Sequence, residues 1–197
     1  MFFLFLSESI FFRLKGGFLS DRHFIGIAAF SLITKSHKYL TAMKDLQLTP
    51  HFKLSEFTRS GTASKYHIDN TLDPNNPQDA VFISNLKALC ENVLEPLRQH
   101  FNVPLIIGSG FRCPKLNSHP EVKGATNSQH LTGEAADIHI PNIATGNAWF
   151  EWMEDNLQFD QLIKEKSTKS SKSFWIHVSF KRSGTNRQQV KFLIKNN

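Results

Sequence analysis

Apolar residues recur at helical spacing between Asp79 and His100 and predict a long core helix. Pro96 lies near the end of this stretch, where we expect a kink or an early end of the helix. Shorter helices are expected at 55–63 and 145–156. Ser55 and Thr145 are suitable N-cap residues for them. The apolar positions of the long helix are Phe82, Leu86, Leu89, Cys90, Val93, Leu94 and Leu97.

Short apolar or alternating runs predict strands in the regions between these helices. They lie at 103–107, 134–140, 159–165, 175–180 and 190–194. Polar stretches rich in Asn, Asp, Pro, Ser or Gly separate them and are typical of loops. The mixture of helices and strands favours an α+β fold, in which helices pack on one antiparallel sheet.

Two of the predicted strands carry residues that can bind a metal. Side chains alternate along a strand, so Ala135 and Asp137 share one face, and His177 projects from one face of the later strand. Gly133 allows the chain to double back, so that His130 can meet Asp137. Two histidines and one carboxylate are a common ligand set for zinc with one open coordination position. The alternative is a polar loop with two hydrogen-bonded histidines, because the chain has nine histidines and lacks an HExxH motif.

An ordered set of motifs resembles the zinc D-alanyl-D-alanine carboxypeptidases of bacterial cell-wall metabolism, the VanY-like enzymes, and related phage endolysins. The motifs are FKLSEFTRSGTA, IDNT, ENVLEPLR, GSGFRCPKLN, SQHLTGEAAD, FDQLI and WIHVS. The resemblance covers about Leu48 to Ile194. It implies a hedgehog-type fold, a Zn2+ cofactor, and peptidoglycan stem peptides or muropeptides as partners.

The resemblance also implies roles for individual residues. Arg112 would hold a carbonyl or carboxylate oxygen of the substrate with its two-pronged guanidinium. Ser128 would contact the substrate, although a plain turn hydroxyl is an equal alternative. Asn117 would bind the substrate or pin the loop that follows Arg112. The implied zinc ligands are His130, Asp137 and His177.

The general base is less clearly indicated than the zinc ligands. Many of the similar enzymes carry an acid three residues before the last histidine, and here that position is Phe174. Glu165 is our first candidate, because a hairpin could bring it near His177. Asp160 is the second candidate, although strand alternation puts it on the opposite face.

The expected chemistry is hydrolysis of a peptide bond by a water whose pKa zinc lowers to about 7. A carboxypeptidase would remove a terminal D-alanine, whereas an endopeptidase would cut between L-alanine and D-glutamate. A catalytically inactive zinc module that binds cell wall is the alternative. A basic nucleic-acid-binding domain is a weaker one, because the aromatic residues mostly follow apolar stripes; no nucleic-acid partner is expected.

The first 42 of the 197 residues differ from the rest. They hold eight of the eighteen phenylalanines, yet charged residues interrupt every apolar run before the roughly 18 uncharged residues that a membrane helix needs. We therefore expect an N-terminal extension at 1–42, a zinc peptidase domain at 43–197, no membrane span and a monomer. Cytoplasmic storage until lysis and export to the envelope both stay open, and Cys90 and Cys113 do not decide between them.

Overall fold

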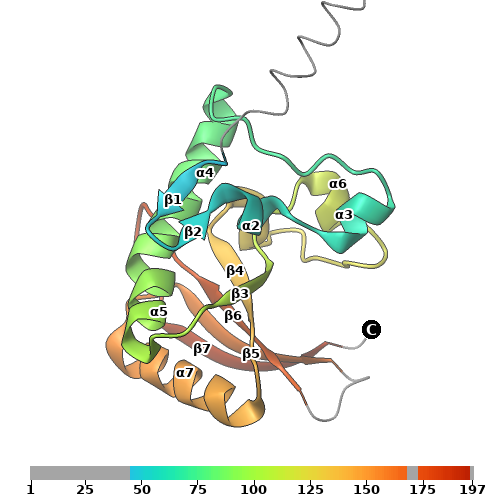
Figure 1. The fold of residues 1–197 in the computed structure, drawn as a ribbon. Coiled ribbons are helices and arrows are strands. Elements are labelled where there is room, and N and C mark those ends of the chain that lie inside the picture. The colour runs from blue at the N-terminus through green and yellow to red at the C-terminus, as the bar shows by residue number, and fades with distance from the viewer. Residues whose placement is uncertain (1–44, 168–172, 196–197) are drawn as a thin grey trace, which may run out of the picture. The chain divides into compact units, whose positions relative to one another are not determined.

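A five-stranded sheet forms the centre of the computed structural model, which describes residues 45–167 and 173–195 (Figure 1). The strand order is β3-β4-β6-β5-β7. The first three pairings are antiparallel, and β5 and β7 run parallel. The α+β class is thus confirmed, with a mixed sheet in place of the wholly antiparallel one expected. The strands are β3 (Ile106–Ser109), β4 (Ala135–His139), β5 (Gln161–Ser167), β6 (Trp175–Ser179) and β7 (Gln189–Lys195).

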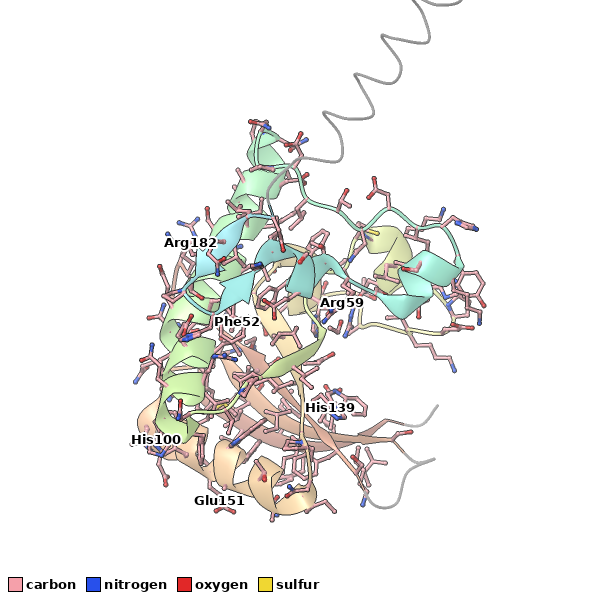
Figure 2. All side chains as sticks on the ribbon, viewed as in Figure 1. Phe52, Arg59, His100, His139, Glu151 and Arg182 are labelled. Carbon is pink, nitrogen blue, oxygen red and sulfur yellow. The ribbon has the colours of Figure 1, made fainter. Side chains whose placement is uncertain are left out.

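Helices cover one face of this sheet and bury its apolar side chains. They are α4 (Pro77–Leu89), α5 (Glu95–Phe101) and α7 (Ile143–Asn156). Ile138 of β4 and Ile176 of β6 are paired across the strands and fully buried in the shared core. His100 lies on α5 (Figure 2). Its ring stacks on Trp152 of α7, with ring centroids 4.3 Å apart. The opposite face of the sheet is therefore left for polar residues.

The long helix is interrupted by a π-helical turn, Cys90–Leu94, between α4 and α5. The Glu95 amide donates to the Cys90 carbonyl five residues back, and Pro96 follows in the first turn of α5. Proline lacks an amide hydrogen and its ring crowds the preceding turn. The wider π-helical turn accommodates the proline ring. In place of the kink or early end expected near Pro96, the helix therefore changes type locally.

The chain before α4 forms a small two-stranded sheet and two short helices, α2 (Leu54–Thr58) and α3 (Gly61–Lys65). The strands are β1 (Gln47–Thr49) and β2 (Phe52–Lys53). The single helix expected at 55–63 was wrong, because Ser60 adopts an extended conformation and its side chain caps α3 by accepting from the Ala63 amide. The helix expected at 145–156 begins earlier, at Ile143, because its N-cap is Asn142 and not Thr145.

Within the described residues, no helix combines the length and apolar character needed to cross a membrane. Both cysteines are free; Cys90 is buried in the core, where burial raises the pKa of its thiol, and Cys113 is half-buried. The expected N-terminal extension, 1–42, lies outside the described residues.

Gly133 should be one of the least replaceable glycines. It has a φ of 70°, and an added Cβ would lie 2.6 Å from the Phe82 carbonyl oxygen. Gly133→Ala should lower the free energy of unfolding by about 1–3 kcal/mol, measured by urea denaturation. Gly61→Ala is the matched control: it has open space in α3, where alanine should be neutral or stabilise by up to about 1 kcal/mol. Equal effects at both sites would contradict this account.

Candidate metal centre

Asp137 and His177 face each other across two central strands. They are register partners in the antiparallel β4–β6 pair, and both are buried. Their neighbours Ile138 and Ile176 point to the opposite, core-covered face. The His177 Nδ1 atom lies 2.9 Å from Asp137 Oδ1. The alternation read from the sequence is thus what brings these two side chains together.

His130 reaches the same place from a 3-10 turn, Gln129–Thr132, that precedes β4. The Ser128 hydroxyl caps this turn and Gly133 ends it in a left-handed conformation, which sends the chain back into β4. The His130 Nδ1 atom lies 2.6 Å from the Gly110 carbonyl oxygen. A carbonyl only accepts, so Nδ1 carries the hydrogen and Nε2 presents its lone pair to the site.

The three potential ligand atoms have the spacing of a small cation site. His130 Nε2 lies 3.3 Å from both His177 Nδ1 and Asp137 Oδ1, and the third separation is 2.9 Å. Ligands held 2.0–2.2 Å from a tetrahedral ion are about 3.3–3.6 Å apart, so the two separations from His130 match and the third is shorter. Among the described residues, these three side chains lie close enough together to share one metal ion. Imidazole nitrogen and carboxylate oxygen are also donors that zinc accepts, so the residues fit the ion that the sequence predicts.

Electrostatics favour the metal-binding forms of His130 and Asp137. Burial lowers the pKa of His130 more than the nearby carboxylate raises it, so the imidazole stays neutral. Burial would raise the pKa of Asp137, but its interactions with His130 and His177 outweigh the effect of burial and hold that pKa well below its usual value. A neutral imidazole and an ionised carboxylate are the forms that bind metal.

Arg112 is fixed beside this group by three bonds. Its Nη2 donates to Asp137 Oδ2 at 2.6 Å and its Nε to the Ser109 hydroxyl at 2.8 Å. Its backbone amide donates to the His130 carbonyl at 3.0 Å. Both charged side chains are about nine-tenths buried. A buried, charge-assisted pair of this kind orients the carboxylate and limits how far Arg112 can move.

A pocket of about 490 Å³ opens beside the metal ligands. Arg112, Ser128 and Glu165 line it together with His130 and His177. Glu165 lies on β5, two residues after Ile163, the register partner of His177, so it projects from the same face of the sheet. The structure therefore brings the first candidate base into the same pocket as the ligands.

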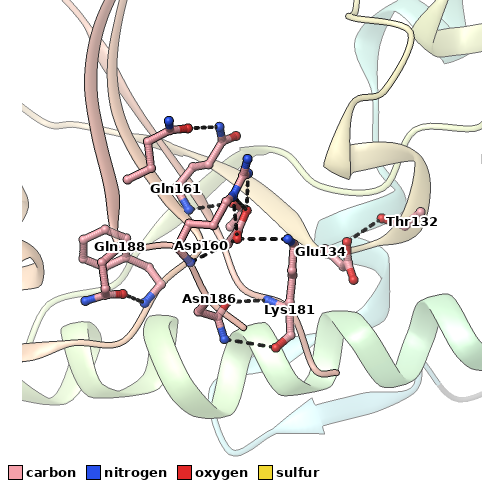
Figure 3. A network of polar contacts seen from close by, with 11 residues as sticks. Thr132, Glu134, Asp160, Gln161, Lys181, Asn186 and Gln188 are labelled. Carbon is pink, nitrogen blue, oxygen red and sulfur yellow. Dashed lines mark hydrogen bonds and ion pairs between the residues drawn. The ribbon is translucent and has the colours of Figure 1, made fainter. Parts of the chain in front are cut away.

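Asp160 has other partners. It is fully buried, forms an ion pair with Arg187, and lies 3.2 Å from the Lys181 ammonium (Figure 3). Burial would raise the pKa of Asp160, but hydrogen bonds from Arg187 and Lys181 outweigh it and lower the pKa. Asp160 is not among the pocket residues, and its contacts anchor the segment between β6 and β7.

Asn117, at the end of α6 (Pro114–Asn117), acts on the pocket through a loop. Its side-chain amide donates to the Ala125 carbonyl, and its backbone carbonyl accepts from the Gly124 amide. An added Cβ at Gly124 would lie 2.0 Å from Asn117 Oδ1. Gly124 and Ala125 line the pocket whereas Asn117 does not, so Asn117 is linked to the pocket through the loop that it holds.

Phe174 occupies the position of the missing acid and points away from the ligands. It packs against the core, and its ring approaches Gly146 of α7. Since Trp175 and His177 share the site face, the residue before Trp175 turns to the helix side. An acid at this position would need a different backbone to reach the metal ligands.

Four residues that complete the site were not identified from the sequence. Ser109 and the Gly110 carbonyl orient Arg112 and His130, and both lie in the quoted GSGFR motif. Arg187 and Lys191 line the far side of the pocket. Their only sequence signal is positive charge near the last strand, which is common on surfaces.

A family model for peptidase M15 matches residues 50–179, which is 130 of the 197 residues. The chain belongs to the peptidase M15 family. All three potential metal ligands and Arg112 fall within the matched span, and members of the family are metallopeptidases. A comparison with curated proteins gave no match. All of β7, with Lys191, and the preceding loop residue Arg187 lie beyond the matched residues of the M15 family.

The neutral state of buried His130 makes the metal-free protein sensitive to acid. Below about pH 6.5 the unfolded chain takes up a proton that the folded imidazole refuses, so stability should fall as pH falls. The slope should reach about 1.4 kcal/mol per pH unit until the folded pKa is passed. Urea denaturation from pH 7.5 to 5.0 with a chelator measures it. His130→Gln should flatten this part of the curve, and an unchanged slope in that variant would contradict the argument.

Proposed function

We propose that this M15 family member is a zinc-dependent peptidase that hydrolyses a peptide bond in the stem peptide of peptidoglycan. The observation that carries the proposal is the group of three ligand atoms, 2.9–3.3 Å apart, whose histidines line a pocket of about 490 Å³. Zinc held by His130, Asp137 and His177 would act as a Lewis acid and lower the pKa of a water to about 7.

Arg112 is suited to stabilise negative charge on the substrate carbonyl oxygen. A guanidinium has five N–H donors. The side-chain bonds to Asp137 and Ser109 use two of them, which leaves others that can donate to a substrate oxygen. The two bonds also fix the guanidinium plane before substrate arrives, so little reorganisation is needed. Loss of one such donor commonly costs about 10²–10³ in turnover.

Glu165 is the residue that we propose as general acid and base. It is buried on β5, where Trp175 and Leu193 are its register partners, and it lines the pocket. Its carboxylate would take the proton that the attacking water releases and then deliver it to the leaving amine. The fixed position of Asp160 on Arg187 and Lys181 makes Asp160 the weaker candidate.

Hollows on both sides of the ligand group favour cleavage inside a peptide. A second hollow of about 400 Å³ is lined by Asp137, Arg112, Trp175 and Thr62, among others. Arg112 borders both hollows, so substrate can extend to either side of it. This supports an endopeptidase over an enzyme that removes a terminal D-alanine.

Digestion of purified muropeptides tests the proposed activity. The zinc-loaded protein should release fragments whose masses identify the bond, and His177→Ala should lose zinc and at least 10³-fold in turnover. Products lacking one D-alanine would indicate a carboxypeptidase. A zinc-loaded protein that binds muropeptides without cleaving them would contradict the peptidase and favour a wall-binding module.

Glu165→Gln tests the proposed base. It should lower kcat by about 10²–10⁴ with KM and zinc content unchanged, because it removes the proton acceptor and keeps the shape. Zinc content is measured by atomic absorption and turnover on the same muropeptides. Glu151→Gln, on the exposed side of α7, is the matched control and should behave as wild type. An active Glu165→Gln beside an inactive, folded Asp160→Asn would transfer the role to Asp160.

A further inference from the structure

One row of side chains crosses the whole sheet and joins the metal ligands to a lysine. In register order it consists of Ser109, Asp137, His177, Ile163 and Lys191. Each is the register partner of the next, so all five project from the site face. Ser109 orients the arginine, the next two are potential metal ligands, and Lys191 ends the row in the pocket wall.

The sheet fixes how far Lys191 lies from the reacting bond. Neighbouring strands are about 4.8 Å apart, so the backbones of His177 and Lys191, two strands apart, are separated by roughly 10 Å. The flexible lysine stem can shorten this gap. An extended peptide advances about 3.3 Å per residue. A group held by Lys191 therefore belongs to a residue within about two or three positions of the bond at the ligand group.

Arg187 adds a second cation to the same wall, and a buried acid holds it there. Its Nε donates to Asp160 Oδ1 at 2.9 Å, and its Nη2 donates to Asp160 Oδ2 (Figure 3). Lys181 also pairs with Asp160, so two cations share one carboxylate and a positive charge remains. The side chain of Arg187 is half exposed and lines the pocket.

The pocket as a whole carries excess positive charge. Its charged lining residues are the cations Arg112, Lys123, Arg187 and Lys191 and the acid Glu165. Arg112 is neutralised by Asp137. Among the described residues, neither Lys123 nor Lys191 forms an ion pair. The uncompensated charge thus lies on the wall away from the metal ligands.

We propose that Lys191 and Arg187 form a subsite that binds a carboxylate of the substrate, separate from the scissile bond, and so select acidic peptides. Both residues lie beyond the span that the M15 family model matches, so the selectivity belongs to this chain's last strand and the loop before it. The inference rests on the proposed function, because it specifies the substrate class of that pocket. Charged ligands gain specificity and encounter rate from such complementarity.

Binding of two synthetic stem peptides tests the subsite. One carries D-glutamate with a free α-carboxylate, and the other carries a carboxamide at that position. Isothermal titration should show the carboxylate peptide binding about tenfold more tightly, and the preference should shrink as salt rises from 0.05 to 0.5 M. Cleavage of both peptides by the zinc-loaded protein is measured in parallel.

Lys191→Met should bring the two Kd values within about twofold of each other, and Lys191→Arg should keep the preference. Arg187→Met should reduce it as well. Lys87→Met is the matched control: it removes one charge from exposed α4, outside the pocket, and should keep the tenfold preference. Loss of the preference in Lys87→Met as well would show a net-charge effect and overturn the subsite.

The outcomes separate this inference from the proposed function. Selective binding without cleavage of either peptide supports the subsite and contradicts the peptidase. Cleavage of both peptides with equal Kd values supports the peptidase and overturns the subsite. If Lys191→Met keeps the same preference for the carboxylate peptide as wild type, the subsite is overturned, whether or not the peptides are cleaved.

Discussion

The buried carboxylate of Asp137 is the interaction on which this side of the sheet depends. An ionised group with so little exposure is tolerated only when charges and donors surround it. Here one oxygen faces the two histidines and the other accepts from Arg112. Arg112 in turn holds the His130 backbone, and Gly110 holds the His130 ring. The site residues therefore hold one another in place, and the Asp137 carboxylate is the group that most of them contact.

This arrangement explains why the strand register matters for chemistry as well as for packing. A slip of one residue between β4 and β6 would place Asp137 opposite an apolar residue and turn ligands toward the core. The helix-covered face disfavours such a slip, because Ile138 and Ile176 are fully buried in its core. Packing on the helix-covered face thus fixes the strand register, and the register fixes the positions of the ligands on the opposite face.

The sequence was most informative where function follows from local periodicity. Alternation around Asp137 and His177 predicted their common face. Gly133 predicted a turn that lets His130 meet Asp137, and the family motifs pointed to Arg112. It could not show that β7 joins β5 in parallel, since an apolar run indicates a strand but not its partner. It also could not place Asp160, whose burial depends on Arg187, 27 residues away. The π-helical turn escaped notice because i, i+4 and i, i+5 patterns look alike over five residues.

The parallel strand β7 has a consequence for how the protein meets other chains. Without it, β5 would be the border of the sheet and would present unpaired backbone donors and acceptors to any extended segment nearby. With it, the border moves to a strand in which Phe192 and Ile194 are exposed but Lys191 interrupts the apolar run. Lys191 therefore has two effects: it adds positive charge to the pocket wall, and it disfavours edge-to-edge aggregation.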